Sequence, residues 1–357
     1  MRVAPRDLES IPTPRQIFEY LDRYVVGQDK AKRTVAIAAY NHLKRCRQKH
    51  AGPGKRLLKK SNILLVGPTG SGKTHIARTL AEMLNVPLSI ADATEFTEAG
   101  YYGKDVEVMV GELLAKANHD VERAQRGIVF IDEIDKIARR SPGARTGAGS
   151  RDIGGEGVQQ SLLKLLEGRE IYVPGNVTQH WNKHDFVLMD TQDILFIAAG
   201  TFADLKPYNE TSHPLGFGHH GATPDMQASD RVTERDLLDY GLIGELLGRL
   251  PVRVRLHPLN EQQMLGVLTG PPDCVVKEFS HLMALDGVDL TFTDEALMAV
   301  VRHAMARHTG ARSLRTLVEE ICHDLMFEAP ERHGEQIVID KAYASARLDR
   351  LGDDLSS

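Results

Sequence analysis

The chain is poor in cysteine and has no long apolar run. Its 357 residues include only three cysteines, at 46, 274 and 322, and no CxxC pair. Three separated cysteines make neither a four-cysteine zinc site nor an even disulfide framework, so no zinc is expected and a reducing, cytoplasmic compartment is favoured. No run of about 18 apolar residues is present, and MRVAPRDLES lacks a signal-peptide core, so no membrane association is predicted.

An excess of positive charge is also absent. The chain has 44 Lys and Arg against 49 Asp and Glu, a net charge of −5. This balance gives the protein no general electrostatic footprint for nucleic acid. One local exception is residues 44–60, KRCRQKHAGPGKRLLKK, with eight Lys or Arg around a Gly-Pro-Gly break. A solvated linker is the leading interpretation, and a local contact with an anion is the alternative.

Four short apolar runs alternate with helical patterns and predict buried strands. They are SNILLV (61–66), VPLSIADA (86–93), GIVFID (127–132) and DILFIAAG (193–200). Strands that alternate with helices predict an α/β fold with a parallel, doubly wound sheet. The Gly- and Ser-rich stretch 141–155 and residues 202–229 are expected to be loops.

The pattern on either side of this α/β region is mainly helical. Apolar spacing predicts helices within residues 14–48, and Thr293 is expected to cap a helix that precedes a second helix and a short strand, QIVID (336–340). We therefore expect N-terminal helices and a basic linker over 1–60, a large nucleotide-binding domain over 61–255, and a small helical domain over 256–357.

A complete phosphate-binding motif, GxxxxGK[ST], follows the first predicted strand and opens a helix. Its residues are Gly67, Pro68, Thr69, Gly70, Ser71, Gly72, Lys73 and Thr74. Glycines let backbone N–H groups surround the phosphates, and the helix N-terminus favours their negative charge. Lys73 is expected to reach the β- and γ-phosphates of ATP, and Thr74 to bind Mg²⁺.

Two carboxylates end the strand GIVFID. Asp132 closes the strand, and its side chain is expected at the sheet edge where open α/β folds bind ligands, holding Mg²⁺ through water. Glu133 follows directly and is expected to polarise the water that attacks the γ-phosphate. A water-activating glutamate favours hydrolysis over transfer to an acceptor hydroxyl.

Two arginines are further candidates for the catalytic site. Arg249 lies near the end of a predicted helix, where a cation suits the helix dipole without any catalytic role. Arg312 lies at the start of a helix, where it gains nothing from the dipole, so an anionic partner such as a nucleotide phosphate is one candidate. Spacing alone leaves both roles open.

Several segments together resemble one family. Besides the two nucleotide motifs they are YVVGQDKAK (24–32), TEAGYYGKDVE (97–107), RDIGGEGVQQSLLKLLEG (151–168), GLIGELLGRLPV (241–252) and TGARSLR (309–315). In this order they resemble the ClpX-type AAA+ protein unfoldases of the Clp/HslU branch. The likeness runs from about residue 12 to 340. The stretch between Gly103 and Asp132 is too short for the intermediate domain of HslU.

The resemblance implies a homohexameric ring with ATP bound between subunits. Arg249 matches the arginine finger that reaches the neighbour's γ-phosphate, and Arg312 matches the sensor that couples nucleotide state to domain angle. The box that wraps the adenine is matched by Val25, Val26, Gly27 and Gln28. The family also has a polar residue, sensor 1, at the end of the strand that corresponds to ILFIAAGTF. Thr201 is the nearest polar candidate for it.

The resemblance also implies loops that face an axial pore. Tyr101 and Tyr102 match the loop that grips the translocated polypeptide, where the family has Gly-Tyr-Val-Gly. Lys183 and His184 match two members of an Arg-Lys-His loop whose first position is Asn182 here, which puts a charge-based substrate preference in doubt. The tripeptide Leu215, Gly216 and Phe217 resembles the segment that docks on the peptidase ClpP.

One departure and three functional hypotheses remain. The family normally begins with a zinc-binding domain, which is missing here through truncation or in a naturally shorter paralogue. The leading hypothesis is an ATP-dependent unfoldase and translocase that feeds a ClpP-like peptidase with tagged or unfolded proteins. The alternatives are a peptidase-independent remodelling chaperone and, remotely, a nucleic-acid motor. The sequence names neither substrates nor adaptors.

Overall fold

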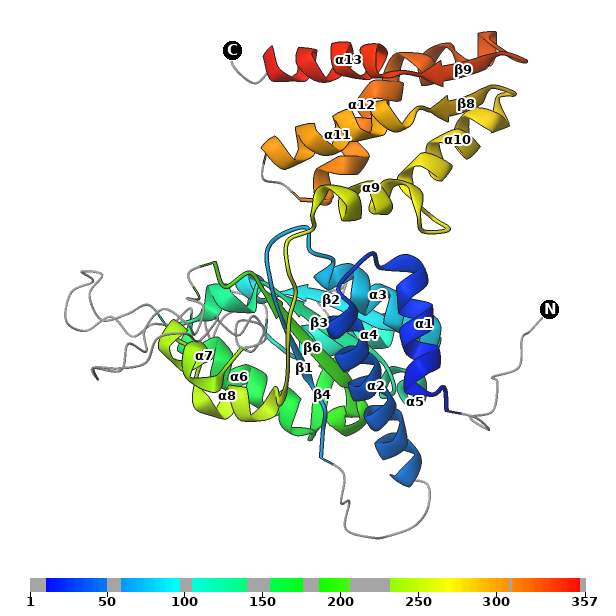
Figure 1. Cartoon of the computed structure of the whole chain (residues 1–357). Helices are drawn as coiled ribbons and strands as arrows, with labels where there is room; N and C mark the ends of the chain where they lie inside the picture. Colours follow the sequence, from blue (N-terminus) through cyan, green and yellow to red (C-terminus); the bar gives the residue numbers. More distant parts are fainter. Residues whose placement is uncertain are drawn as a thin grey trace, which may run out of the picture. The chain divides into compact units, whose positions relative to one another are not determined.

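The computed structural model describes residues 11–49, 59–96, 105–139, 155–175, 186–203, 205, 232–307 and 310–353 (Figure 1). The chain divides into two compact units. The first consists of Met1–Phe18, Lys30–Gly67 and Lys73–Leu256, and the second of Glu19–Asp29, Pro68–Gly72 and His257–Ser357. Within the described residues, none of the helices is both long and apolar enough to cross a membrane.

A five-stranded parallel sheet forms the centre of the first unit. In spatial order its strands are β2 (Leu88–Asp92), β3 (Ile128–Asp132), β6 (Leu195–Gly200), β1 (Ile63–Val66) and β7 (Val252–Arg255). Every residue of β1 and β6 is buried, as expected of parallel strands covered on both faces. The four strands predicted from apolar runs and the parallel α/β fold are confirmed (Figure 1).

Helices supply the layers around this sheet. The helices that precede β7 along the chain are α1 (Pro14–Tyr24), α2 (Asp29–Lys49), α3 (Lys73–Leu84), α4 (Val108–Lys116), α5 (Val121–Ala124), α6 (Glu156–Glu167), α7 (Glu234–Tyr240) and α8 (Gly244–Arg249), and the residues of α1 from Glu19 onward belong to the second unit. Buried apolar residues of α4, α6 and α8 pack together with alternate residues of the strands in one hydrophobic core. Buried Ile76 and Leu80, one helical turn apart on α3, lie on the face of that helix which meets the sheet.

Three strands of the first unit were not predicted. An antiparallel ribbon pairs β4 (Glu170–Pro174) with β5 (Phe186–Asp190), and β7 extends the main sheet. The ribbon exposes Tyr172, Phe186 and Leu188 on one face, so its sequence lacks the regular apolar–polar alternation of a half-buried strand. Strand β7 reads VRVR, and its arginines obscured a strand of the sheet.

The second unit is mainly helical. It contains α9 (Glu261–Thr269), α10 (Val275–Leu285), α11 (Asp294–Ala306), α12 (Arg312–Glu328) and α13 (Lys341–Asp353), with a two-stranded parallel sheet of β8 (Asp289–Phe292) and β9 (Gln336–Ile339). Among the described residues, 3₁₀ turns occur in the first unit at η1 (Ala93–Glu95), η2 (Ile134–Ile137) and η3 (Thr191–Asp193), and in the second unit at η6 (Ala329–Glu331). The predicted cap is confirmed, since the Thr293 hydroxyl accepts a hydrogen bond from Ala296 N.

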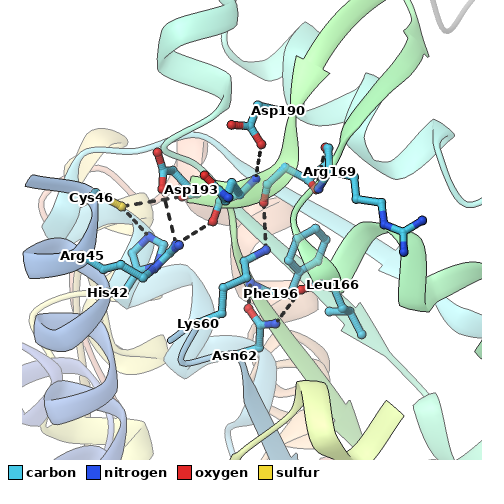
Figure 2. A network of polar contacts seen from close by, with 12 residues as sticks. His42, Arg45, Cys46, Lys60, Asn62, Leu166, Arg169, Asp190, Asp193 and Phe196 are labelled. Carbon is cyan, nitrogen blue, oxygen red and sulfur yellow. Dashed lines mark hydrogen bonds and ion pairs between the residues drawn. The ribbon is translucent and has the colours of Figure 1, made fainter. Parts of the chain in front are cut away.

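The basic segment 44–60 is not simply a solvated linker. Arg45, on α2, is only 2% exposed, and its Nη2 donates to Gln192 O at 2.6 Å and lies 3.6 Å from Asp193 Oδ1. Lys60 Nζ donates to Thr191 O at 2.8 Å and lies 4.8 Å from the centre of the Phe196 ring (Figure 2). The linker interpretation is therefore wrong at these two cations, because η3 supplies carbonyl and carboxylate partners that charge spacing cannot reveal.

Lys60 predicts a measurable pH dependence. Burial, followed by repulsion from Arg45, lowers the pKa of Lys60 to about 7. Because an unfolded lysine keeps its proton up to about pH 10.4, the unfolded chain binds more protons than the folded chain between pH 7 and that value, and stability rises with pH. Relative to Lys60→Met, the wild type should gain about 1 kcal/mol of unfolding free energy per pH unit between pH 7.5 and 9.5. Urea denaturation of both proteins measures this, and a pH-independent difference would contradict it.

Candidate ATPase site

The loop between β1 and α3 has the conformation needed to surround an anion. Gly70 and Gly72 have φ values of +75° and +96°, which side chains other than glycine rarely tolerate. Lys73, the first residue of α3, is 9% exposed, and its Nζ donates to Gly67 O at 2.7 Å. The lysine ammonium is thus bound to the backbone of the first residue of its own motif.

Two carboxylates lie at the carboxyl end of β3. Asp132 Oδ2 accepts a hydrogen bond from Thr74 Oγ1 on α3 at 3.4 Å, and Asp132 Oδ1 accepts from Glu133 N at 3.0 Å. Glu133 is exposed and adopts a left-handed conformation with φ +55°. A left-handed residue other than glycine stores strain, and such strain concentrates at functional sites. This left-handed conformation turns the chain immediately after the strand, and the Glu133 side chain is exposed to solvent.

Asp135 is a residue of this region that the sequence analysis missed. It is buried in η2, and its Oδ2 accepts a hydrogen bond from Phe202 N at 3.2 Å. A Cβ placed on Gly200 would lie 2.7 Å from Asp135 Oδ1, so only glycine allows this approach. Asp135 thereby holds the backbone at Phe202, two residues after β6, a strand that lies between β1 before the phosphate loop and β3 with Asp132. Its signal was a charged residue within the apolar run after Glu133.

In the second unit, the side chain of Gln28 connects the segment Val25–Gln28 to the phosphate loop. Gly27 and Gln28 have φ values of +66° and +60°. The Gln28 amide donates to His257 O at 2.7 Å and to Ser71 O at 3.3 Å, and accepts from His257 N at 3.1 Å. The side chain of Gln28 is therefore occupied by backbone groups, while Val25 is buried beside it in sequence. Any adenine contact made by this segment would come from its backbone and its valines.

Arg312 begins α12 directly after a tight approach to the same loop. Gly310 has φ +61°, and a Cβ placed on it would lie 2.9 Å from Thr69 O and 3.2 Å from the Gly70 Cα. Arg312 is exposed, two residues later. The glycine turn thus brings the start of α12 against the phosphate loop within the second unit.

Arg249 is the last residue of α8, as its predicted place near a helix end requires. Its side chain is 49% exposed, and Nη2 lies 2.9 Å from Glu167 Oε1 at the end of α6. An exposed guanidinium with one carboxylate partner is available to bind a further anion. The pairing of these two residues could not be seen from the sequence.

Comparison with known proteins decides the family. A family model described as AAA domain (Cdc48 subfamily) matches residues 58–253, and the C-terminal D2-small domain of ClpB protein matches 259–336. A protein of Wolinella succinogenes named ATP-dependent Clp protease ATP-binding subunit ClpX 2 is 44% identical over 92% of this chain and 80% of its own. The ClpX proteins of Porphyromonas gingivalis and Treponema denticola are 44% and 43% identical over 95% and 93% of this chain, and over 83% and 81% of their own lengths. The chain belongs to the ClpX family of AAA+ ATPases.

The residues of this ClpX-family site fit a nucleotide with Mg²⁺. The glycine loop and Lys73 present N–H and ammonium groups for phosphates, and Ser71 Oγ, buried, has no hydrogen-bond partner among the described residues. Thr74 and Asp132 offer the hydroxyl and carboxylate oxygens that Mg²⁺ takes beside water and phosphate. No cluster of three His, Cys, Asp or Glu suited to a metal occurs among the described residues.

Some ClpX-family residues singled out in the sequence fall outside the described ranges. They are Tyr101, Tyr102, Lys183, His184, Leu215, Gly216 and Phe217. Residues 141–154, expected to form a loop, also lie outside the described ranges, which resume at Gly155. Their roles rest on the resemblance alone and stay predictions.

Proposed function

We propose that this chain is the ATPase subunit of a ClpXP-like protease. It would assemble as a homohexamer, unfold protein substrates and thread them through the ring pore into a ClpP-like peptidase. The observation that carries the proposal is the match to ClpX proteins over more than nine tenths of the chain, together with an intact phosphate loop and paired carboxylates. We also propose 61–255 and 256–357 as the large and small domains.

Within each subunit the roles follow from the site. Mg²⁺-bound ATP, when present, supplies the phosphoanhydride bond whose cleavage drives motion. Lys73 would bind the terminal phosphates, and Thr74 and Asp132 would hold the Mg²⁺ ion that accompanies them. Glu133, whose carboxylate is exposed, orients a water and accepts its proton. Thr201, which precedes the Phe202 N–H bound by Asp135, is proposed to report on the γ-phosphate.

Two arginines are proposed to complete the site. Arg249 acts in trans as an arginine finger on the nucleotide of a neighbouring subunit, which its exposure on α8 supports. Arg312 acts within its own subunit, which the approach of Gly310 to Thr69 and Gly70 supports. Val25, Val26 and the backbone of Gly27 and Gln28 are proposed to enclose the adenine.

Substrate grip and peptidase docking are proposed on the resemblance. Tyr101 is the main gripping ring, Tyr102 is a second, and Lys183 and His184 line the pore entrance. Leu215, Gly216 and Phe217 dock in an apolar cleft of the peptidase. The leucine conserves the volume of the isoleucine usual in the family.

One assay tests grip and docking together. Tyr101→Ala combined with Tyr102→Ala should lower the rate of unfolding of a degradation-tagged fluorescent protein by about tenfold or more, because the loop loses the rings that transmit force. Loss of fluorescence is measured with ATP, with a trapping chaperone and, separately, with the peptidase.

Phe217→Ala is the matched control. It should keep trap-assisted unfolding and lose only degradation, because docking lies outside the pore. Unfolding at the normal rate in the double tyrosine variant would refute the grip, and normal degradation by Phe217→Ala would favour a different docking element.

A further inference from the structure

Glu167 holds the proposed finger from within the same subunit. It is the last residue of α6, and its side chain is 24% exposed. Its Oε1 lies 2.9 Å from Arg249 Nη2, and its Oε2 pairs with the guanidinium of Arg169. One carboxylate therefore binds two arginines, one with each oxygen.

The backbone that carries this carboxylate is fixed by a buried amide. Asn62, 1% exposed and directly before β1, donates to Leu166 O at 3.5 Å and to Arg249 O at 3.0 Å. Its Oδ1 accepts from Phe196 N at 3.4 Å on β6 (Figure 2). The ends of α6 and α8 are thus attached to the sheet through the same side chain.

A buried hydroxyl fixes the same turn from the other side. Thr191, fully buried, donates to Leu165 O at 3.0 Å and accepts from Arg169 N at 3.1 Å. Because these contacts set the backbone of both Glu167 and Arg249, the remaining freedom of the finger lies in its own side chain. Glu167 is the group that restricts that freedom.

We propose that Glu167 is a positioning residue for Arg249. It orients the guanidinium toward the nucleotide of the neighbouring subunit, an inference that rests on the proposed trans role of Arg249. Arg169 pairs with the other oxygen of the same carboxylate, which holds the carboxylate in place while one face of the Arg249 guanidinium meets a phosphate.

A purely structural role for the pair of Glu167 and Arg249 predicts a normal rate of ATP hydrolysis in a folded Glu167→Ala protein. Half-exposed ion pairs contribute little to stability, so removal of Glu167 should hardly change the unfolding transition. A misplaced catalytic group, in contrast, lowers turnover strongly. The two readings therefore separate in the rate of hydrolysis.

The first test is steady-state kinetics. Glu167→Ala should lower kcat for ATP by about 10- to 100-fold and change KM less than about threefold, since binding groups of the subunit's own site stay in place. Glu167→Gln, whose amide oxygen still accepts a hydrogen bond, should recover most of the loss. Glu170→Ala, three residues further on an exposed position of β4, is the matched control and should behave as wild type.

The second test mixes subunits. A Glu133→Gln subunit has a normal finger and an inactive site, whereas an Arg249→Ala or Glu167→Ala subunit has the reverse. If Glu167 acts through the neighbour's site, mixed rings of Glu167→Ala and Glu133→Gln should hydrolyse ATP faster than either parent ring. Assembly is checked by size exclusion with ATP, and Glu167→Ser, which also lacks the carboxylate, replaces Glu167→Ala in every mixture if the latter does not assemble.

The outcomes separate the inference from the proposed function. Complementation by both Arg249→Ala and Glu167→Ala supports the positioning role. Complementation by Arg249→Ala alone, or kcat of Glu167→Ala within twofold of wild type, overturns it and leaves the finger intact. Failure of Arg249→Ala to complement refutes the trans finger, and the positioning role falls with it.

Discussion

Glu133→Gln is expected to bind ATP normally and to hydrolyse it at least about 100-fold more slowly than wild type. The substitution keeps the size of the side chain and removes the carboxylate that accepts the proton of the attacking water. Neither the phosphate loop nor the pair of Thr74 and Asp132 depends on the Glu133 side chain, because the contact to Asp132 comes from the Glu133 backbone N–H. Binding should therefore survive.

The measurement is phosphate release at saturating ATP, with binding followed by a fluorescent nucleotide. Glu122→Gln, at an exposed position of the short helix α5, serves as control and should show wild-type turnover. Turnover of Glu133→Gln within a few-fold of wild type would remove Glu133 from the role of base. Lost binding would instead assign it a part in holding the nucleotide.

Gln159→Leu is expected to destabilise the first unit by about 2–5 kcal/mol. Gln159 is fully buried on α6; its Nε2 donates to Ile137 O at 2.8 Å and to Gly241 O at 3.3 Å, and its Oε1 accepts from Ile243 N at 2.8 Å. Leucine fills a similar volume but forms no hydrogen bonds. The buried backbone groups Ile137 O, Gly241 O and Ile243 N would therefore lose their bonds to Gln159. Such loss costs more than the bond itself is worth, because the groups stay out of reach of water.

Urea denaturation, monitored by circular dichroism in the absence of nucleotide, measures this decrease in the free energy of unfolding. Gln125→Leu, at the partly exposed end of α5, is the matched control and should shift the transition little. An unchanged midpoint for Gln159→Leu would mean that the three backbone groups find other partners.

The sequence predicted the parts of the fold whose signal is local. The strands β1, β3 and β6 are continuous apolar runs, and the phosphate loop is a motif in which each residue has a fixed task. Strand β7 was missed because its arginines alternate with only two valines, and the ribbon of β4 and β5 because its exposed face is apolar.

Contacts between distant segments were beyond the sequence for a different reason. Glu167 and Arg249 are 82 positions apart, and Arg45 and Gln192 are 147 apart. No spacing rule relates such pairs, since the fold alone brings them together. The same holds for Asp135, whose carboxylate meets the backbone at the end of β6.

Helix α6 has a further consequence. One end carries Gln159, bonded to the segment that follows Glu133, and the other carries Glu167, bonded to Arg249. Its twelve residues span about 18 Å as a stiff rod. If Arg249 serves the neighbouring subunit, as we propose, α6 touches both the segment behind Glu133 and the finger that leaves the subunit. A displacement of this helix would then reach two nucleotide sites, which makes α6 one physical route for coupling between neighbouring subunits.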